Sequence, residues 1–240
     1  MFSRLLQKTN LLSLKTTLFP NYTKPEELVN SVTSAIGAIL SFVGLSVILC
    51  FASIKGNVSL GFSLCLFCGV AGLLYIVSGL YHSFGPGRTK YILRILDHIC
   101  IYLFVTVTYT ALALDSLQRG WDWSLFGVRA RWGWLFFGAI WGLAAVGIVL
   151  ELVLKGRLDK LPLLLNGAMS WFIVIGMKGI FATIPEAATV WLFTGLCAYI
   201  FGFVCLYCCR KLPFYHALWH LFVIAGSLFH FFAVLHICFA

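Results

Sequence analysis

Charged side chains are scarce in this chain of 240 residues, since Asp, Glu, Lys and Arg together make up only 10% of it. Soluble proteins average about 25%. Hydrophobic residues reach 61%, so the charged side chains are too few to cover the surface of a soluble particle of this size. A water-soluble globule is therefore excluded, and we expect the chain to lie in lipid.

Acidic residues are scarcer still, with 8 Asp and Glu against 17 Lys and Arg. The cations form no contiguous basic run with interleaved aromatic residues, so no nucleic acid partner is expected. Residues 1–30 contain no uninterrupted apolar core of a secretory signal, and we expect no cleavable signal peptide. The 9 cysteines lie almost entirely in apolar stretches, which argues against a disulfide framework.

Long apolar runs fill most of the sequence and predict an all-α integral membrane protein. A spanning helix needs about 20 apolar residues, and short segments with glycine, proline or charge separate the runs. We predict a seven-helix transmembrane domain at 27–240, with spans at about 28–54, 58–83, 91–116, 133–154, 161–184, 187–209 and 213–239. A short basic tail at 1–26 precedes it and is predicted to be amphipathic.

The distribution of cations between the runs predicts the orientation. The tail and alternate loops carry 12 Lys and Arg, whereas the opposite side carries 4. The positive-inside rule then places the N-terminus in the cytoplasm and the C-terminus outside. This orientation is the inverse of a rhodopsin-like receptor, so no G protein is expected as a partner. We expect a multi-pass protein of a plasma or inner membrane.

Ionisable side chains inside the predicted spans are few, and because each costs roughly 2.5–3.5 kcal/mol to insert, they indicate function. The predicted topology brings four of them to one level in the cytoplasmic leaflet: His82, Asp97, His216 and His220. The spacing of His216 and His220 places both imidazoles on one helix face, where they can reach a common ion. We predict that these two and His82 are metal ligands, because three neutral nitrogen ligands and an open position are typical of catalytic zinc.

Asp97 and Ser78 are the candidate catalytic residues. Zinc lowers the pKa of a bound water to about 7, and Asp97 is the candidate for accepting the proton of that water. Ser78 lies one turn before His82, where its hydroxyl could hydrogen-bond the water or a developing oxyanion. Iron and manganese stay open as the metal, whereas the imidazoles disfavour magnesium and calcium.

Packing is the alternative explanation for each of these histidines. His230 shares the helix face of His216 but lies about 20 Å deeper, which favours polar packing or a place in a substrate channel. His98 is turned by about 100° from Asp97 and is a minor alternative ligand. Glu151 is predicted to pair with Lys155, one turn later on the same helix.

Three motifs together resemble the haemolysin III-like family, within the progestin and adipoQ receptor superfamily. They are Ser78-Gly-Leu-Tyr-His82, the stretch from Leu96-Asp-His to Thr108-Tyr-Thr110, and His216-Ala-Leu-Trp-His220. The resemblance implies seven helices, an inward N-terminus and an intramembrane zinc held by His82, His216 and His220. One departure is Thr33-Ser34, where the family pattern has a Thr-His pair.

The resemblance leaves three functions open, each with membrane lipids as partners, such as ceramide or a fatty acid. The first is membrane-lipid homeostasis, with zinc as the cofactor in hydrolysis of a lipid amide such as ceramide. Adiponectin receptors of the superfamily are linked to this reaction. The second is a non-enzymatic membrane sensor or receptor with structural zinc. The third is a cytolysin, against which the chain shows no run of charged pore-lining residues.

Overall fold

The computed structural model describes residues 20, 22–55, 58–118, 123–125, 128–130, 132–154, 164–170, 174 and 184–239. Six long helices dominate these residues: α3 (Lys24–Lys55), α4 (Val58–Ser83), α5 (Arg88–Gln118), α6 (Trp132–Leu154), α8 (Glu186–Cys208) and α9 (Tyr215–Phe239). Each is long and apolar enough to cross a membrane. The described part of the chain is therefore a bundle of membrane-spanning helices.

Six of the seven predicted spans are confirmed as helices of this kind. The predicted fifth span at 161–184 lies largely outside the described residues, although 164–170 are helical. The predicted amphipathic tail lies outside them up to residue 19 and at residue 21. The all-α prediction missed a small antiparallel hairpin of β1 (Trp123–Leu125) and β2 (Val128–Ala130). Three-residue strands are too short to leave a periodic signal in a sequence.

Helix α3 begins at Lys24, inside the predicted tail, because a capping box starts it. The Thr23 backbone N–H donates to Glu26 Oε2 at 2.8 Å. The Glu26 N–H donates back to Thr23 Oγ1 at 3.4 Å. This reciprocal pair satisfies backbone donors that the first turn of a helix leaves open. The first turn of α3 is thereby fixed, together with the two glutamates that it carries.

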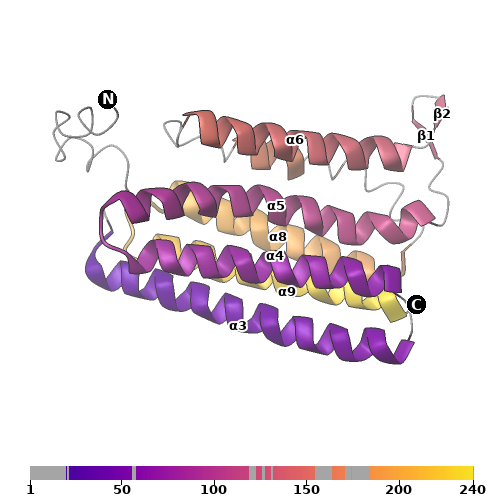
Figure 1. Ribbon diagram of the computed structural model, residues 1–240, viewed down its shortest axis with the longest axis horizontal. Coiled ribbons are helices and arrows are strands. Elements are labelled where there is room, and N and C mark those ends of the chain that lie inside the picture. The colour runs from indigo at the N-terminus through magenta and orange to yellow at the C-terminus, as the bar shows by residue number, and fades with distance from the viewer. Residues whose placement is uncertain are drawn as a thin grey trace.

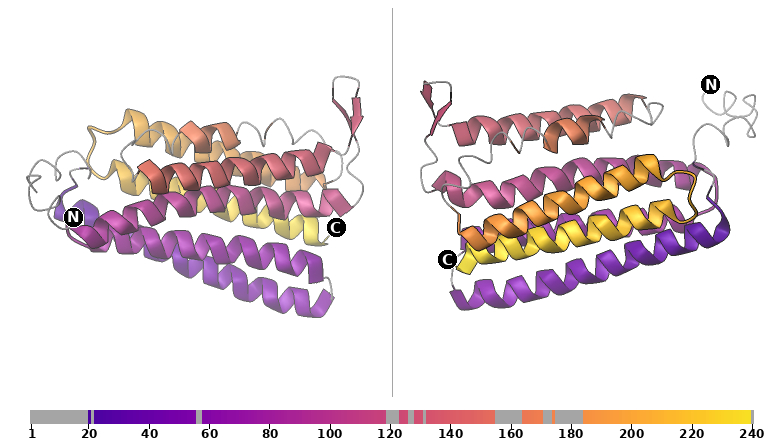
Figure 2. Two further views of the ribbon diagram at one scale, coloured as in Figure 1. Left: turned by 45° about the horizontal axis from the view of Figure 1, so that its top comes forward. Right: turned by 180° about the vertical axis from the view of Figure 1, so that it is seen from behind.

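The helices lie roughly side by side (Figure 1). Helices α3 to α6 alternate in direction, α8 runs in the same direction as α6, and α9 runs opposite to α8. Helix α4 packs between α3 and α5, α6 packs on α5, and α9 contacts α3 and α8. The views from two further directions show that α3, α5 and α9 begin at the same end of the bundle, where α4 and α8 finish (Figure 2). We call this the α3-start end.

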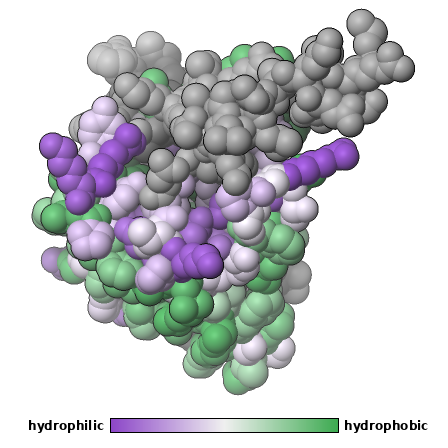
Figure 3. Space-filling model, turned by 90° about the vertical axis from the view of Figure 1, so that its left-hand side faces the viewer, coloured by the Kyte–Doolittle hydropathy of each residue, from purple (hydrophilic) through white to green (hydrophobic). Residues whose placement is uncertain are grey.

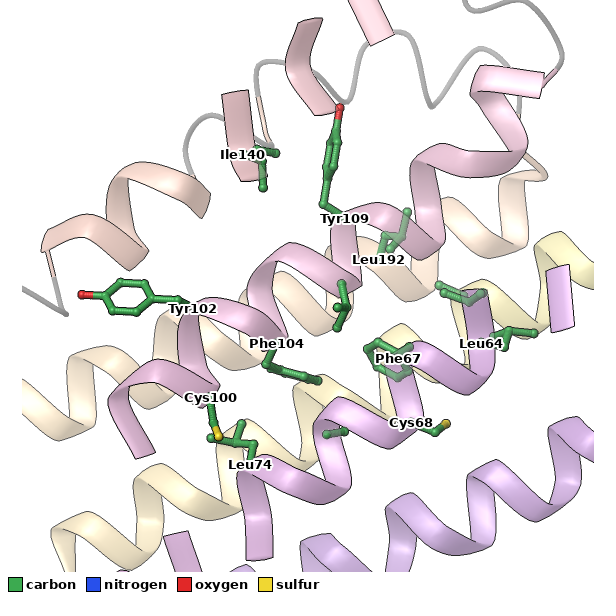
Figure 4. Close-up of a cluster of buried hydrophobic side chains, with 14 of the residues drawn as sticks. Leu64, Phe67, Cys68, Leu74, Cys100, Tyr102, Phe104, Tyr109, Ile140 and Leu192 are labelled. Carbon is green, nitrogen blue, oxygen red and sulfur yellow. The ribbon is translucent and has the colours of Figure 1, made fainter. Parts of the chain in front are cut away.

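The core is apolar and lies along α4 and α5 (Figure 4). Phe67 and Phe104 meet there with ring centroids 5.5 Å apart. Large apolar side chains also stay exposed on outer faces, for example Ile39, Val149 and Phe201, as expected where lipid is the solvent. Hydrophilic residues, in contrast, gather at the α3-start end, which faces the viewer in Figure 3.

The close contact between α8 and α9 predicts that Gly202 cannot be replaced by a larger residue without a loss of stability. A Cβ on Gly202 would lie 2.6 Å from the Cβ of Phe222, which no side-chain rotation can move. We expect Gly202→Ala to separate the helices and to destabilise the protein by about 1–3 kcal/mol. Gly142→Ala is the control, because no described atom beyond the adjoining residues and backbone of its own helix lies within 4 Å of its Cβ position. Thermal unfolding in detergent measures both, and equal melting temperatures would contradict the prediction.

Candidate metal centre

Three histidines from two helices meet at the α3-start end. His82 is the last residue but one of α4, and His216 and His220 occupy the first two turns of α9. One nitrogen of each ring lies within 4.8 Å of the others. The ring centroids of His216 and His220 are 4.6 Å apart, and that of His82 lies 5.0 Å from the first and 5.2 Å from the second. The structure thus brings the three predicted ligands together.

The start of α9 is positioned by α3. Phe214, just before α9, has a positive φ of 61°, a left-handed conformation that bulky residues rarely adopt. Its backbone N–H donates to Glu26 Oε1 at 3.1 Å. Glu26 therefore connects the first turn of α3 to the turn that aims His216 inward.

His82 is hydrogen-bonded on one side and unpartnered on the other. Its Nδ1 lies 2.6 Å from Glu27 Oε2. The second oxygen of Glu27 accepts from Lys90 Nζ at 2.5 Å. Among the described residues, the buried Nε2 of His82 has no hydrogen-bond partner. Because a carboxylate only accepts, Nδ1 carries the proton and Nε2 is the atom able to bind a metal.

His220 is held by α3 in a similar way. Its Nδ1 lies 3.2 Å from the backbone carbonyl oxygen of Asn30, and the hydroxyls of Thr33 and Ser34 approach the same nitrogen at 3.0 and 3.3 Å. A carbonyl only accepts, so Nδ1 of His220 also carries the proton. Nε2 is left for a ligand.

His216 completes the cluster beside an aromatic side chain. Its Nδ1 is buried and finds no partner within the described part of the chain. The Tyr22 ring packs 5.1 Å from the His216 ring and 5.8 Å from that of His82. Burial, and a hydrogen bond with Tyr215, raise the pKa of the Tyr22 phenol far above its ordinary value. Tyr22 therefore covers two of the three rings as a neutral group.

The two candidate catalytic residues lie beside the cluster. Asp97 comes from α5 and Ser78 from α4, one turn before His82. The Asp97 carboxylate accepts a hydrogen bond from the Ser78 hydroxyl and lies within electrostatic range of His82. Asp97 does not belong to the ligand group that the described residues form. A carboxylate that lies next to a metal site but does not ligate the ion is free to exchange a proton.

Three other ionisable residues of the described spans, Glu151, His98 and His230, lie outside the cluster. Glu151 is only 2% exposed, and its Oε1 lies 2.9 Å from His98 Nδ1. Glu151 thus bonds the neighbouring helix, while its predicted partner Lys155 lies outside the described residues. His98 is not part of the ligand group. His230 is buried, and its ring packs 5.1 Å from that of Tyr199 in the α8–α9 contact, which supports polar packing.

The sequence interpretation missed the contribution of α3 to the site. Glu27, Asn30, Thr33 and Ser34 all contact His82 or His220, and none was predicted as a site residue. Their spacing held the signal, because residues three, four and seven apart share one face of a helix. A polar stripe on an otherwise apolar helix indicates a buried polar contact.

The fold and the cluster define a class: a helical, multi-pass membrane protein with a buried trihistidine site at one end of its bundle. A family model described as "Haemolysin-III related" matches residues 22–231. The chain belongs to this family, which confirms the resemblance seen in the motifs, and it is a multi-pass integral membrane protein.

Two curated relatives support the assignment along nearly the whole chain. The "Hemolysin-3 homolog" of Bacillus subtilis (strain 168) is 34% identical over 217 residues, which cover 90% of this chain and 96% of the relative. The "Hemolysin-3" of Bacillus cereus is 34% identical over 210 residues, which cover 88% and 90%. No solved structure gives a significant match.

The buried contact between His98 and Glu151 predicts a stability effect. His98→Ala leaves the Glu151 carboxylate buried without the donor at 2.9 Å, which we expect to cost about 1–3 kcal/mol. His236→Ala is the control, because His236 is exposed and its ring bonds a carbonyl of its own helix. Thermal unfolding in detergent should show a lower melting temperature for His98→Ala alone. A similar loss in both variants would count against this contact.

Proposed function

We propose that His82, His216 and His220 hold a zinc ion and that the protein hydrolyses a lipid amide, such as ceramide, in membrane-lipid homeostasis. One observation carries the proposal: three imidazoles meet in a buried place, and described residues leave Nε2 of His82 and Nδ1 of His216 unpartnered. Nitrogen donors suit zinc better than magnesium or calcium. Three neutral ligands leave the fourth tetrahedral position open, as in catalytic zinc sites.

The neighbouring residues supply the remaining chemistry. When bound, zinc would polarise a substrate carbonyl and lower the pKa of a water molecule. Asp97 would accept the proton of the attacking water and return it to the leaving amine. Ser78 would donate a hydrogen bond to the oxyanion that develops on the carbonyl, or would orient Asp97. Both roles are supported by the position of Asp97 beside His82 and Ser78.

We infer that the site lies in the cytoplasmic leaflet, with seven spans and the N-terminus inside. The α3-start end carries Lys90, Arg94, Arg210 and Lys211 in or beside its turns, which agrees with the positive-inside rule. The ligands lie within two turns of the helix ends. At 1.5 Å per residue this depth is about 10 Å or less, within reach of an amide just below the lipid headgroups.

A sensor or receptor with structural zinc is the second candidate, because the cluster joins α4 to α9. The open fourth position and the adjacent Asp97 favour hydrolysis over this alternative. A cytolysin is the third candidate, suggested by the name of the Bacillus cereus relative, "Hemolysin-3". The experiments below separate the three.

Metal content tests the site. We expect about one zinc per chain in protein purified in detergent, and we expect His82→Ala, His216→Ala and His220→Ala to lose it, because two imidazoles hold zinc poorly. His236→Ala is the matched control at the far end of α9 and should keep its zinc. Elemental analysis measures all five proteins. Zinc that survives in His82→Ala would show that the site is misplaced.

Turnover tests the chemistry. We expect Asp97→Asn to retain zinc and to lose amide hydrolysis by a factor on the order of 10²–10⁴, since it removes the proton acceptor. Release of fatty acid from defined ceramides by the purified protein is the measurement. Stoichiometric zinc without any cleavage in the wild type would favour the structural-zinc sensor. Leakage of dye from liposomes that His220→Ala leaves unchanged would favour a cytolysin.

A further inference from the structure

Glu27 occupies a position that the three proposed ligands do not explain. It lies in the first turn of α3, a helix that contributes no histidine to the cluster. One carboxylate oxygen lies 2.6 Å from His82 Nδ1 and the other 2.5 Å from Lys90 Nζ. Glu27 thus connects the end of α4 to the start of α5.

Glu27 is held in place by its ion pair with the buried Lys90. The Lys90 side chain is only 3% exposed, and its Nζ also donates to the backbone carbonyl of Phe84 at 3.1 Å. The ammonium lies 4.7 Å from the centroid of the Tyr81 ring. A buried ammonium needs such partners to offset its desolvation. These contacts restrict where the carboxylate of Glu27 can lie.

The bond to Nδ1 determines how His82 can bind a metal. A carboxylate that accepts from one ring nitrogen leaves the other as the ligand atom and fixes the orientation of the ring. Partners of this kind are general in metalloproteins, and their removal typically weakens metal affinity 10- to 100-fold. In this chain the remaining nitrogen, Nε2, is the buried atom that lacks a partner among described residues.

We propose that Glu27, held by Lys90, is a positioning residue that fixes His82 as an Nε2 ligand of the metal. This inference rests on the proposed zinc site and adds a carboxylate outside the ligand set. Glu27 does not touch the metal or the substrate. It sets the ring orientation of His82, so its removal weakens binding and distorts the geometry without removing a ligand.

Glu186 supplies a control at the other end of the bundle. It also lies in the first turn of a helix, α8, and its side chain is exposed. Helix α8 begins at the end opposite to the cluster (Figure 2). Glu186→Gln removes one negative charge there, whereas Glu27→Gln removes the charge that faces both Lys90 and His82.

The test measures zinc affinity of the full chain in detergent by competition with a chromogenic chelator. We expect zinc to bind 10- to 100-fold more weakly to Glu27→Ala, more weakly to Glu27→Gln by a smaller factor, and with unchanged affinity to Glu186→Gln. Lys90→Met should weaken binding in the same direction as Glu27→Gln. With Co²⁺ in place of zinc, the visible absorption bands should shift in the Glu27 variants only, because these bands report ligand geometry.

Two negative results are distinguishable. If the wild type binds zinc, His82→Ala loses it, and both Glu27 variants match the wild type in affinity and Co²⁺ spectrum, the role of Glu27 is wrong while the zinc site stands. If the wild type binds no zinc, the proposed function and this inference both fall. Glu27→Gln nearly preserves shape, so it decides the matter if Glu27→Ala does not fold.

Discussion

A ring nitrogen buried in a lipid-embedded bundle has no water as a partner, so it must bond to the chain or bind a ligand. Helix α3 supplies the chain partners: Glu27 for Nδ1 of His82, and the Asn30 carbonyl for Nδ1 of His220. A buried polar atom left unpaired costs about 1–3 kcal/mol. Nε2 of His82 and Nδ1 of His216 lack described partners, and the proposed cation would bind one nitrogen of each ring.

The same constraint explains why α3 is necessary although it holds no ligand. The capping box of Thr23 and Glu26 fixes its first turn, and Glu26 also holds the turn before α9. Glu27, the next residue along the chain, meets His82, and α3 packs against both α4 and α9. The two histidine-bearing helices also meet directly, through apolar packing and through the Tyr75–Ser227 hydrogen bond, which lies deeper in the bundle. Hydrogen bonds to a third helix at the level of the cluster are directional and restrict shifts that apolar packing would tolerate.

The sequence was sufficient to predict that these three histidines meet, but not which residues support them. Positions 82, 216 and 220 could be inferred because helix-face spacing and alternating topology are both periodic properties. Glu26 and Glu27 looked alike, since two acids in the first turn of a helix are common. Only packing decides which of them meets His82. Thr33-Ser34 stood out as a missing histidine, whereas in the structure both hydroxyls approach Nδ1 of His220.

A histidine bonded to a carboxylate is not by itself a sign of metal binding, and the chain contains the comparison. His82 bonds Glu27 at 2.6 Å and His98 bonds Glu151 at 2.9 Å. The spacing rule paired Glu151 with Lys155 because it considers one helix at a time, while the observed partner comes from α5. The two pairs differ in what lies at the other ring nitrogen. Beside His82 stand two further imidazoles, whereas His98 belongs to no such group among described residues. Convergence of rings from separate helices, not the carboxylate, is therefore the observation that makes His82 a candidate metal ligand and His98 a buried polar contact.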